Sequence, residues 1–185
     1  PVLSEELGLD PFRVPASSAA SYLRLLTAPP RTWSGTQLFP HIDYAASVAA
    51  TMGLGDFGGS AVGFYVARAV RGTGALLRDL DDVAAYKLRG IPGFQADLRD
   101  AAGAAAGVAG GPGRHFELLL RREVRANRAL AYPAWLLHRA LVADDAAERL
   151  RDDPESGRLT LNLFYTTEGH PIRQGLAPAA EPADA

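Results

Sequence analysis

A histidine in an apolar stretch is the first candidate for chemistry in this chain. His138 stands in Trp135-Leu136-Leu137-His138-Arg139-Ala140-Leu141-Val142, where helical spacing would put Trp135 and Val142 on its face. An imidazole beside an apolar cavity could act as a general base or ligate haem, although a core histidine held by a hydrogen bond is the more common case. Tyr132, one segment earlier, is a second proton-transfer group. We therefore predict His138 and Tyr132 as catalytic residues, and Trp135 as a substrate contact.

Arginines on the preceding segment could bind an anionic substrate. In a helix, Arg121, Arg125 and Arg128 would share one face and could hold a carboxylate or phosphate. Glu117 and Glu123 would partly neutralise that face, so a solvated surface is the alternative. The sequence predicts Arg121 and Arg125 as substrate-binding residues.

A second histidine has a carboxylate two positions away. In an extended segment, His41 and Asp43 of the His-x-Asp sequence would point the same way; His170 could complete a two-histidine, one-carboxylate iron site, and Arg173 could bind an oxo acid. This pattern resembles the motif of the 2-oxoglutarate oxygenases. The resemblance implies a double-stranded β-helix with many strands between the ligands, whereas residues 75 to 153 have helical patterns. The alternative is that Asp43 caps a helix and His41 lies in a loop.

Two shorter motifs have both a chemical and a structural interpretation. Residues 53 to 58 form GxGxxG, which could hold a phosphate on backbone N–H groups, but the residues before it do not form the β-branched strand that a dinucleotide fold requires. The alternative is a helix stop and a flexible turn.

Asp79, Asp81 and Asp82 form a DxDD sequence that resembles the acid motif of class II terpene cyclases. The alternative is a solvated helix face.

Composition excludes several kinds of site. The 185 residues include no cysteine, which excludes disulfides, zinc ribbons, iron–sulfur clusters and thiolate-ligated haem. The net charge of −2 gives no general attraction to nucleic acid. No apolar run approaches the ~20 residues that cross a bilayer, and no basic and apolar signal opens the sequence. We therefore expect a cytoplasmic protein that binds neither nucleic acid nor membrane.

Periodicity predicts mostly helices. Helical spacing covers the ranges 43–52, 76–88, 94–108 and 115–153, with a break at Pro133 and a short last helix that begins near Asp145. The range 61–70 fits a helix or a strand. Leu159, Leu161 and Leu163 alternate with polar or aromatic residues and predict a strand over 158–167.

These elements predict a mainly α fold, a single-domain bundle of about six helices with a minor C-terminal β element; an α+β fold is the alternative. The domain is expected to span 1–174, followed by a flexible Pro/Ala-rich tail over 175–185. A lone strand must pair. Its partner is either 61–67 or the same strand of a second copy, which would make a homodimer.

Three functions remain open at this point. The first is a small cytoplasmic enzyme that binds an organic small molecule between helices and uses acid–base chemistry without a cofactor. The second is a non-catalytic interaction or assembly subunit that uses the strand and the tail. The third is a haem or non-haem iron protein that uses His138 alone or His41, Asp43 and His170 together. No resemblance covers enough of the chain to decide among them.

Overall fold

The fold consists of two facing antiparallel β-sheets. The structure is a computed structural model that describes residues 21–27, 32–33, 37, 39–44, 46–55, 57–68, 77, 79–93, 95, 115–155 and 157–165. The strands in these ranges are β1 (Tyr22–Leu26), β2 (Val48–Gly53), β3 (Ser60–Ala67), β4 (Phe116–Glu123), β5 (Ala129–Pro133), β6 (His138–Val142) and β7 (Arg158–Tyr165). The helical segments are α2 (Leu80–Ala85), the π-helix η4 (Tyr86–Gly90) and α4 (Asp144–Ala147).

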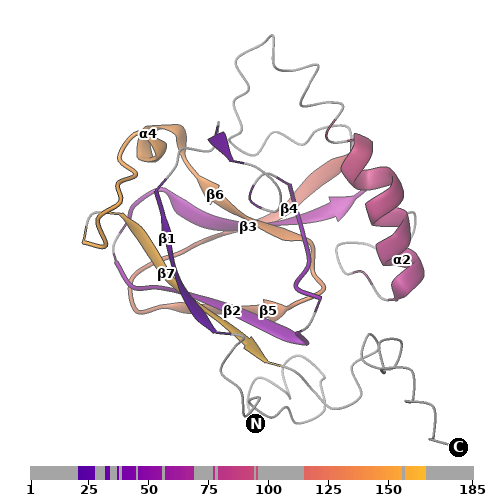
Figure 1. The fold of residues 1–185 in the computed structure, drawn as a ribbon, viewed down its shortest axis with the longest axis horizontal. Helices are drawn as coiled ribbons and strands as arrows, with labels where there is room; N and C mark the ends of the chain where they lie inside the picture. Colours follow the sequence, from indigo (N-terminus) through magenta and orange to yellow (C-terminus); the bar gives the residue numbers. More distant parts are fainter. Residues whose placement is uncertain are drawn as a thin grey trace, which may run out of the picture.

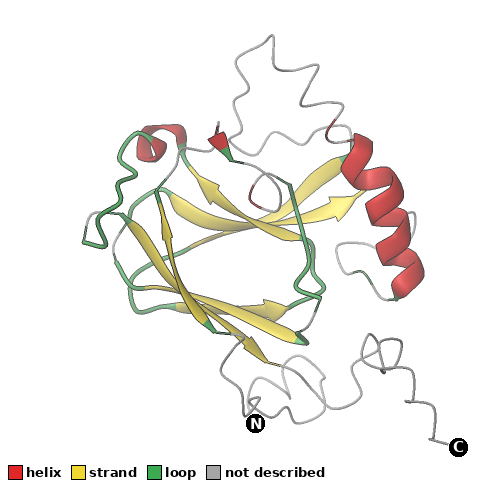
Figure 2. Cartoon of the chain, in the orientation of Figure 1, coloured by secondary structure: helices red, strands yellow, loops and turns green. Residues whose placement is uncertain are grey.

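The strands divide into a sheet of four and a sheet of three. The larger sheet has the order β1-β7-β2-β5 and the smaller the order β4-β3-β6, with every pairing antiparallel. Figure 1 shows the two sheets stacked face to face, and Figure 2 shows the helical segments lying outside them. After β4 the chain changes sheet at each strand, from β4 to β5, β6 and β7. The interior between the sheets therefore receives side chains from strands far apart in sequence.

A short extended segment before β2 lengthens the smaller sheet. His41 forms an isolated antiparallel bridge with His138, the first residue of β6. The His41 N–H donates to the His138 carbonyl and the His138 N–H donates to the His41 carbonyl, both at 2.9 Å. The Asp43 N–H donates to the Ala134 carbonyl at 2.8 Å. Residues 41 to 43 are thus fixed beside the start of β6.

The core is built from buried side chains on the inner faces of both sheets. Phe64 of β3 packs edge-on against Tyr132 of β5, with ring centroids 5.1 Å apart, and so joins the two sheets. A second cluster surrounds α4, where Ala146 is fully buried and Leu150 is 5% exposed. Burying a large apolar side chain such as Phe64 or Leu150 contributes about 1.5–3 kcal/mol by transfer from water.

The predicted helical bundle is wrong. The range 115–153, expected to be helical, holds β4, β5, β6 and only the four-residue helix α4. Leucine, alanine and arginine dominate these strands and have high helix propensity, but pairing with β3 and β2 satisfies the backbone and overrides that preference. The protein is therefore mostly β.

The range 43–52 is also not a helix. It contains β2, which lies between β7 and β5, so its backbone pairs on both sides. Ala49 and Ala50 are buried there. The small side chains that suggested an Ala-rich helix belong instead to a strand inside the sandwich.

Other predictions have mixed outcomes. For the range 61–70 both a helix and a strand were open, and the structure has the strand β3 there. The strand expected over 158–167 is confirmed as β7. The predicted pairing with 61–67 is wrong, because β7 pairs with β1 on one side and β2 on the other. The homodimer stays a prediction, but β7 is already paired along both edges within the chain. The helix expected over 76–88 is present as α2 and η4.

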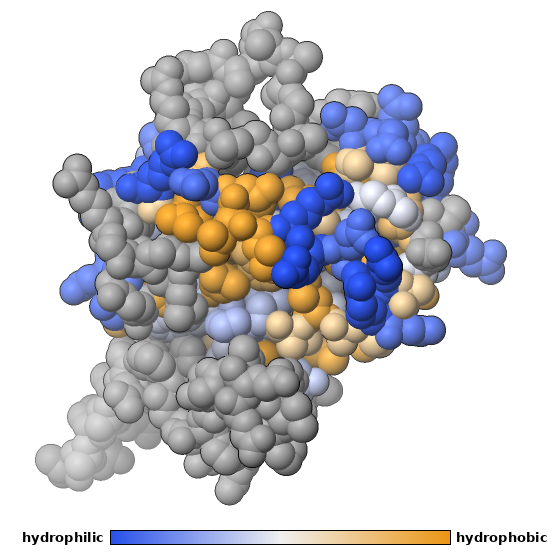
Figure 3. Space-filling model, turned by 180° about the vertical axis from the view of Figure 1, so that it is seen from behind, coloured by the Kyte–Doolittle hydropathy of each residue, from blue (hydrophilic) through white to orange (hydrophobic). Residues whose placement is uncertain are grey.

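Some expectations fall outside the described residues, namely most of the helix over 94–108 and the tail over 175–185. Within the described part of the chain, no helix is long and apolar enough to cross a membrane. Figure 3 shows the reverse of the molecule, where an apolar area lies among hydrophilic side chains. Leu119 and Leu120 of β4 are among the exposed large apolar residues.

Candidate metal centre

Two histidines and one aspartate meet at the edge of the sandwich. One ligand atom from each of His41, Asp43 and His138 lies within 4.8 Å of the other two. The Nε2 atom of His138 is 3.3 Å from Oδ2 of Asp43, and the two imidazole rings are 4.6 Å apart at their centroids. This is the donor set of a two-histidine, one-carboxylate metal site, which leaves other coordination positions open.

Strand geometry explains the convergence. In an extended segment, residues two apart point to the same side, so His41 and Asp43 both face the pocket while Ile42 points to the other side and is buried in the core. The backbone bridge between His41 and His138 then places the third ligand beside the first. The ligand set therefore depends on pairing between positions nearly a hundred residues apart.

Hydrogen bonds orient both imidazoles. Nδ1 of His138 lies 2.8 Å from the Leu136 carbonyl oxygen, and Nδ1 of His41 lies 3.3 Å from that of Phe39. A carbonyl oxygen only accepts, so each Nδ1 is the donor and each neutral ring keeps a lone pair on Nε2. A metal-binding histidine is commonly held in this way.

The environment favours a neutral His41. Burial lowers the pKa of its imidazole, and the neighbouring His138 lowers it further, against a smaller opposing effect of Asp43. A metal binds the unprotonated ring, so no proton has to be displaced near neutral pH. Tyr86 supports the same segment, because its hydroxyl donates a hydrogen bond to the Pro40 carbonyl.

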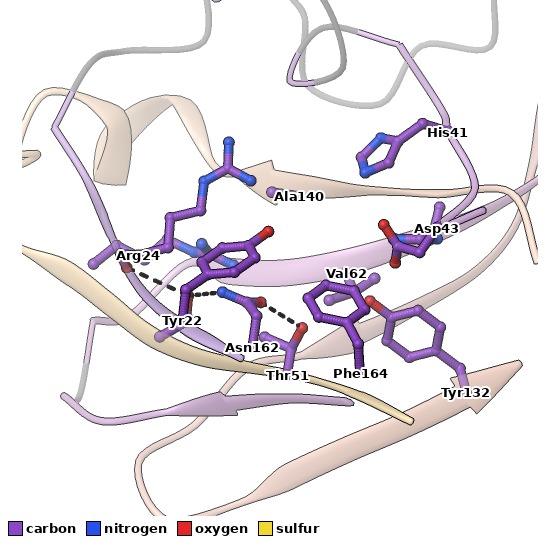
Figure 4. A pocket seen from close by; sticks show the side chains of 13 residues that line it. Tyr22, Arg24, His41, Asp43, Thr51, Val62, Tyr132, Ala140, Asn162 and Phe164 are labelled. Carbon is purple, nitrogen blue, oxygen red and sulfur yellow. Dashed lines mark hydrogen bonds and ion pairs between the residues drawn. The ribbon is translucent and has the colours of Figure 1, made fainter. Parts of the chain in front are cut away.

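A pocket opens between the sheets beside the three ligands (Figure 4). From the larger sheet it is lined by Tyr22, Arg24, Thr51, Tyr132, Arg158, Thr160, Asn162 and Phe164, and from the smaller sheet by Val62, His138 and Ala140. His41 and Asp43 complete the lining. The three ligand side chains thus face a space that a second molecule could enter.

The floor of the pocket is a chain of polar side chains. The Thr51 hydroxyl donates to Oδ1 of Asn162 at 3.0 Å, and Nδ2 of Asn162 donates to the Thr160 hydroxyl at 3.3 Å. The Thr160 hydroxyl donates to the Arg24 carbonyl at 3.4 Å. These bonds, dashed in Figure 4, fix the orientation of the side chains that face the metal ligands from the opposite sheet.

Two arginines face the same pocket. Arg158, the first residue of β7, is only 4% exposed, and its Nε donates to the Ser60 hydroxyl. Burial, and then the charge of Arg24, lower the pKa of the Arg158 guanidinium to about 10, so it stays charged near neutral pH. Arg24 and Arg158 do not take part in the ion pairs Arg68–Glu117 and Arg125–Glu123 or in the contact between His138 and Asp43. Within the described part of the chain, neither pocket arginine has an acidic partner.

Tyr132 forms part of the wall next to His138. It is buried, and its ring centroid is 4.7 Å from that of His138. Burial raises the pKa of its hydroxyl, so the group stays protonated and can donate a hydrogen bond but is a poor base.

The structure brings together some of the predicted site residues and not others. His138 and Tyr132, which the sequence predicted as the catalytic pair, both line the pocket. Trp135 does not; it is buried in the core between β5 and β6. Arg121 on β4 and Arg125 after it are exposed and outside the pocket lining, and Arg125 pairs with Glu123 at 2.5 Å.

The iron-site hypothesis named His41 and Asp43 together with His170, whereas the described cluster contains His138 as its second histidine. His41 and Asp43 lie together, and the described histidine beside them is His138. His170 and Arg173, which that hypothesis also named, lie outside the described residues. The objection that the chain lacked strands between the ligands is removed, because β2 to β5 all lie between Asp43 and His138.

The remaining motifs have structural roles. The glycine-rich residues 53 to 58 connect β2 to β3, and no helix follows them. In the DxDD sequence, Asp79 caps α2 by accepting the Asp82 N–H at 2.8 Å. Neither segment lines the pocket.

Sequence reasoning missed Arg24 and Arg158. The signal was present in β7, where alternation puts Arg158, Thr160, Asn162 and Phe164 on one face. The alternation was used only to predict a strand, and no function was assigned to either of its faces. In the structure the polar face is the one that lines the pocket.

A comparison with protein-family models matches residues 1–165 to a family described as a family of unknown function, DUF6445. The chain belongs to this family. The match contains all the pocket residues, from Tyr22 to Phe164. Searches of the curated proteins and of the solved structures found no match. Within DUF6445, the interpretation of this chain therefore depends on the geometry of its own site.

Proposed function

We propose that the protein is a mononuclear non-haem iron(II) oxygenase that uses a 2-oxo acid as cosubstrate. The observation that carries the proposal is the convergence of His41, Asp43 and His138 within 4.8 Å at the edge of a pocket that also contains the buried Arg158. Two imidazoles and one carboxylate with open positions are the ligand set of iron(II) oxygenases. The paired sheets also agree with the double-stranded β-helix that the His-x-Asp resemblance implies.

The arginine distinguishes this proposal from a zinc hydrolase. Catalytic zinc also uses two histidines and a carboxylate, so the ligands alone do not choose between the metals. A hydrolytic site needs no buried cation on the opposite sheet. Arg158 offers a fixed guanidinium that can bind a carboxylate through two hydrogen bonds. A 2-oxo dicarboxylate chelates a metal through its 2-oxo acid end. The carboxylate at its other end needs a cation such as this guanidinium.

The chain's own residues have distinct tasks in this function. His41, Asp43 and His138 hold the metal, and the Nδ1 bonds to Phe39 and Leu136 keep the imidazoles aimed. Arg158, held by Ser60, receives the distal carboxylate. The bound iron(II) supplies the place where O₂ and the 2-oxo acid react.

The overall reaction balances without a further reductant. The 2-oxo acid loses CO₂ and takes one atom of O₂ into the new carboxylate, and the other oxygen atom enters a C–H bond of the second substrate to give an alcohol. The 2-oxo acid and the C–H bond supply two electrons each, which together reduce O₂. Tyr132 and Phe164 close part of the wall around this space, so water is partly excluded from it.

His138 was first considered as a general base. Its Nε2 atom lies 3.3 Å from Oδ2 of Asp43, so the Nε2 lone pair would be used to bind the metal that Asp43 also binds. The proposal therefore replaces cofactor-free acid–base chemistry with metal-dependent oxidation at the same residue.

The test is the conversion of 2-oxoglutarate to succinate and CO₂ by protein loaded with iron(II) in the presence of O₂. Many such sites turn over slowly without the second substrate, so product is measured over several hours by mass spectrometry. We expect succinate that depends on iron and O₂, and its loss in Asp43→Ala. The exposed Asp145 gives the control Asp145→Ala, which should retain it. Equal succinate from both variants, or none from the wild type, would overturn the proposal.

A further inference from the structure

The pocket contains more positive charge than one cosubstrate can neutralise. Arg24 and Arg158 both line it, Asp43 is the acidic residue of the lining, and both histidines are neutral as metal ligands. With a divalent ion, the net charge is plus three. A 2-oxo dicarboxylate neutralises two of these charges, and one remains.

Arg24 carries the positive charge that the 2-oxo dicarboxylate does not neutralise. It belongs to the edge strand β1 and is half-buried, whereas Arg158 is buried to 4% exposure. Figure 4 shows its side chain extending from β1 toward Ala140 on the opposite sheet. No carboxylate of the described residues forms an ion pair with it. Among the described residues, the guanidinium thus lines the pocket without a carboxylate to neutralise it.

Arg24 affects the other arginine of the pocket. Its charge contributes to lowering the pKa of the Arg158 guanidinium, which lines the same pocket. An anion beside Arg24 would relieve this repulsion. Because β7 places Arg158 deeper than the half-exposed Arg24, the two guanidinium groups can serve two different acids.

Aromatic rings lie beside this cation. Tyr22 of β1 stacks on Phe164 of β7, with ring centroids 5.7 Å apart and an angle of 27° between the planes. Tyr22 is 47% exposed, which places the pair at the rim of the pocket. Stacked rings at a rim provide an apolar surface for a flat or branched carbon skeleton.

We propose that the substrate to be oxidised is a monoanionic organic acid with an aromatic or other apolar body, whose carboxylate binds Arg24 and whose body lies against Tyr22 and Phe164. This inference rests on the proposed function, since it assigns Arg158 to the 2-oxo acid. A neutral or cationic molecule of the same shape would leave Arg24 without a counter-charge and bind more weakly.

The probe for this assignment is 3-phenylpropionate, with the uncharged 3-phenylpropanamide as its matched control. Each is titrated calorimetrically, without O₂, into protein loaded with iron(II) and 2-oxoglutarate. We expect the acid to bind at least about tenfold more tightly than the amide, which corresponds to about 1.4 kcal/mol. Equal affinities would overturn the inference.

Variants then assign the charge to Arg24. Arg24→Gln should remove the preference for the acid, Arg24→Lys should retain part of it, and the exposed Arg89 of η4 gives the control Arg89→Gln, which should change nothing. Binding of 2-oxoglutarate is measured in the same proteins and should stay within about threefold of wild type, because it depends on Arg158. If Arg24→Gln weakens 2-oxoglutarate binding as much as Arg158→Gln does, Arg24 serves the cosubstrate and the inference fails.

The first step of the titration separates this inference from the proposed function. Failure of iron(II) or 2-oxoglutarate to bind would overturn the proposed function, and the inference with it. Normal binding of both, followed by no preference for the acid over the amide, would overturn only the assignment of Arg24.

Discussion

His41 and His138 are joined by a pair of reciprocal backbone hydrogen bonds of 2.9 Å, and their imidazole rings lie 4.6 Å apart at the centroids. The same contact therefore closes the edge of the smaller sheet and assembles the ligand set. The site and the fold form together, because neither histidine reaches the other without the bridge.

Two glycines of the GxGxxG sequence should respond differently to substitution. A Cβ on Gly53 would lie 2.5 Å from the Arg125 carbonyl oxygen, which is backbone, whereas one on Gly55 would meet only the Gly157 carbonyl oxygen at 4.0 Å. We expect Gly53→Ala to lower the free energy of unfolding by about 1–3 kcal/mol. Gly55→Ala should change it by less than about 0.5 kcal/mol. Urea denaturation measures both, and equal losses would contradict this packing account.

Arg158→Gln should weaken the cosubstrate and leave the metal in place. Loss of a buried charge-assisted contact predicts a KM for 2-oxoglutarate raised about 100-fold, or about 2.7 kcal/mol. Iron affinity should stay near that of the wild type, because Arg158 is not a ligand. The exposed Arg122 of β4 provides the control Arg122→Gln. A KM unchanged in Arg158→Gln would show that another group holds the 2-oxo acid.

Metal should stabilise the folded protein. A ligand that binds only the native state at 100 times its Kd adds about 2.7 kcal/mol. For a chain of this size, that amounts to a rise in Tm of about 5–10 °C. Mn²⁺, a redox-stable substitute for iron(II), should produce the rise in the wild type and in Asp145→Asn, and a chelator should reverse it.

Asp43→Asn is the informative variant in that experiment. The amide keeps the shape of the carboxylate but removes its charge, so the rise in Tm should be largely lost. A rise equal to that of the wild type would mean that the metal binds elsewhere on the chain.

The β-sandwich could be predicted from the sequence only in part. The alternation of Leu159, Leu161 and Leu163 predicted β7 correctly, because a strand of eight residues carries its period in its own side chains. β4 and β5 carry no such signal. Their leucine, alanine and arginine residues favour helix locally, and only pairing with β3 and β2, far along the chain, makes them strands.

The candidate metal site, like the fold, could be predicted from the sequence only in part. The spacing of His41 and Asp43 is local, so their common direction could be predicted from the sequence. The third ligand and the two arginines are brought in by long-range pairing, of β6 with residue 41 and of β7 with β1 and β2. Without the register of those pairs, the sequence did not distinguish His170 from His138 as the third metal ligand. It also gave no reason to place Arg158 near the histidines.

The central claim is that His41, Asp43 and His138 hold one metal ion, and an anaerobic titration with iron(II) tests it most directly. We expect one ion per chain, with a visible charge-transfer band on addition of 2-oxoglutarate. Binding should be lost in His41→Ala and His138→Ala but retained in His115→Ala, a histidine outside the pocket lining. Stoichiometric iron binding that survives in His41→Ala and His138→Ala would contradict the account.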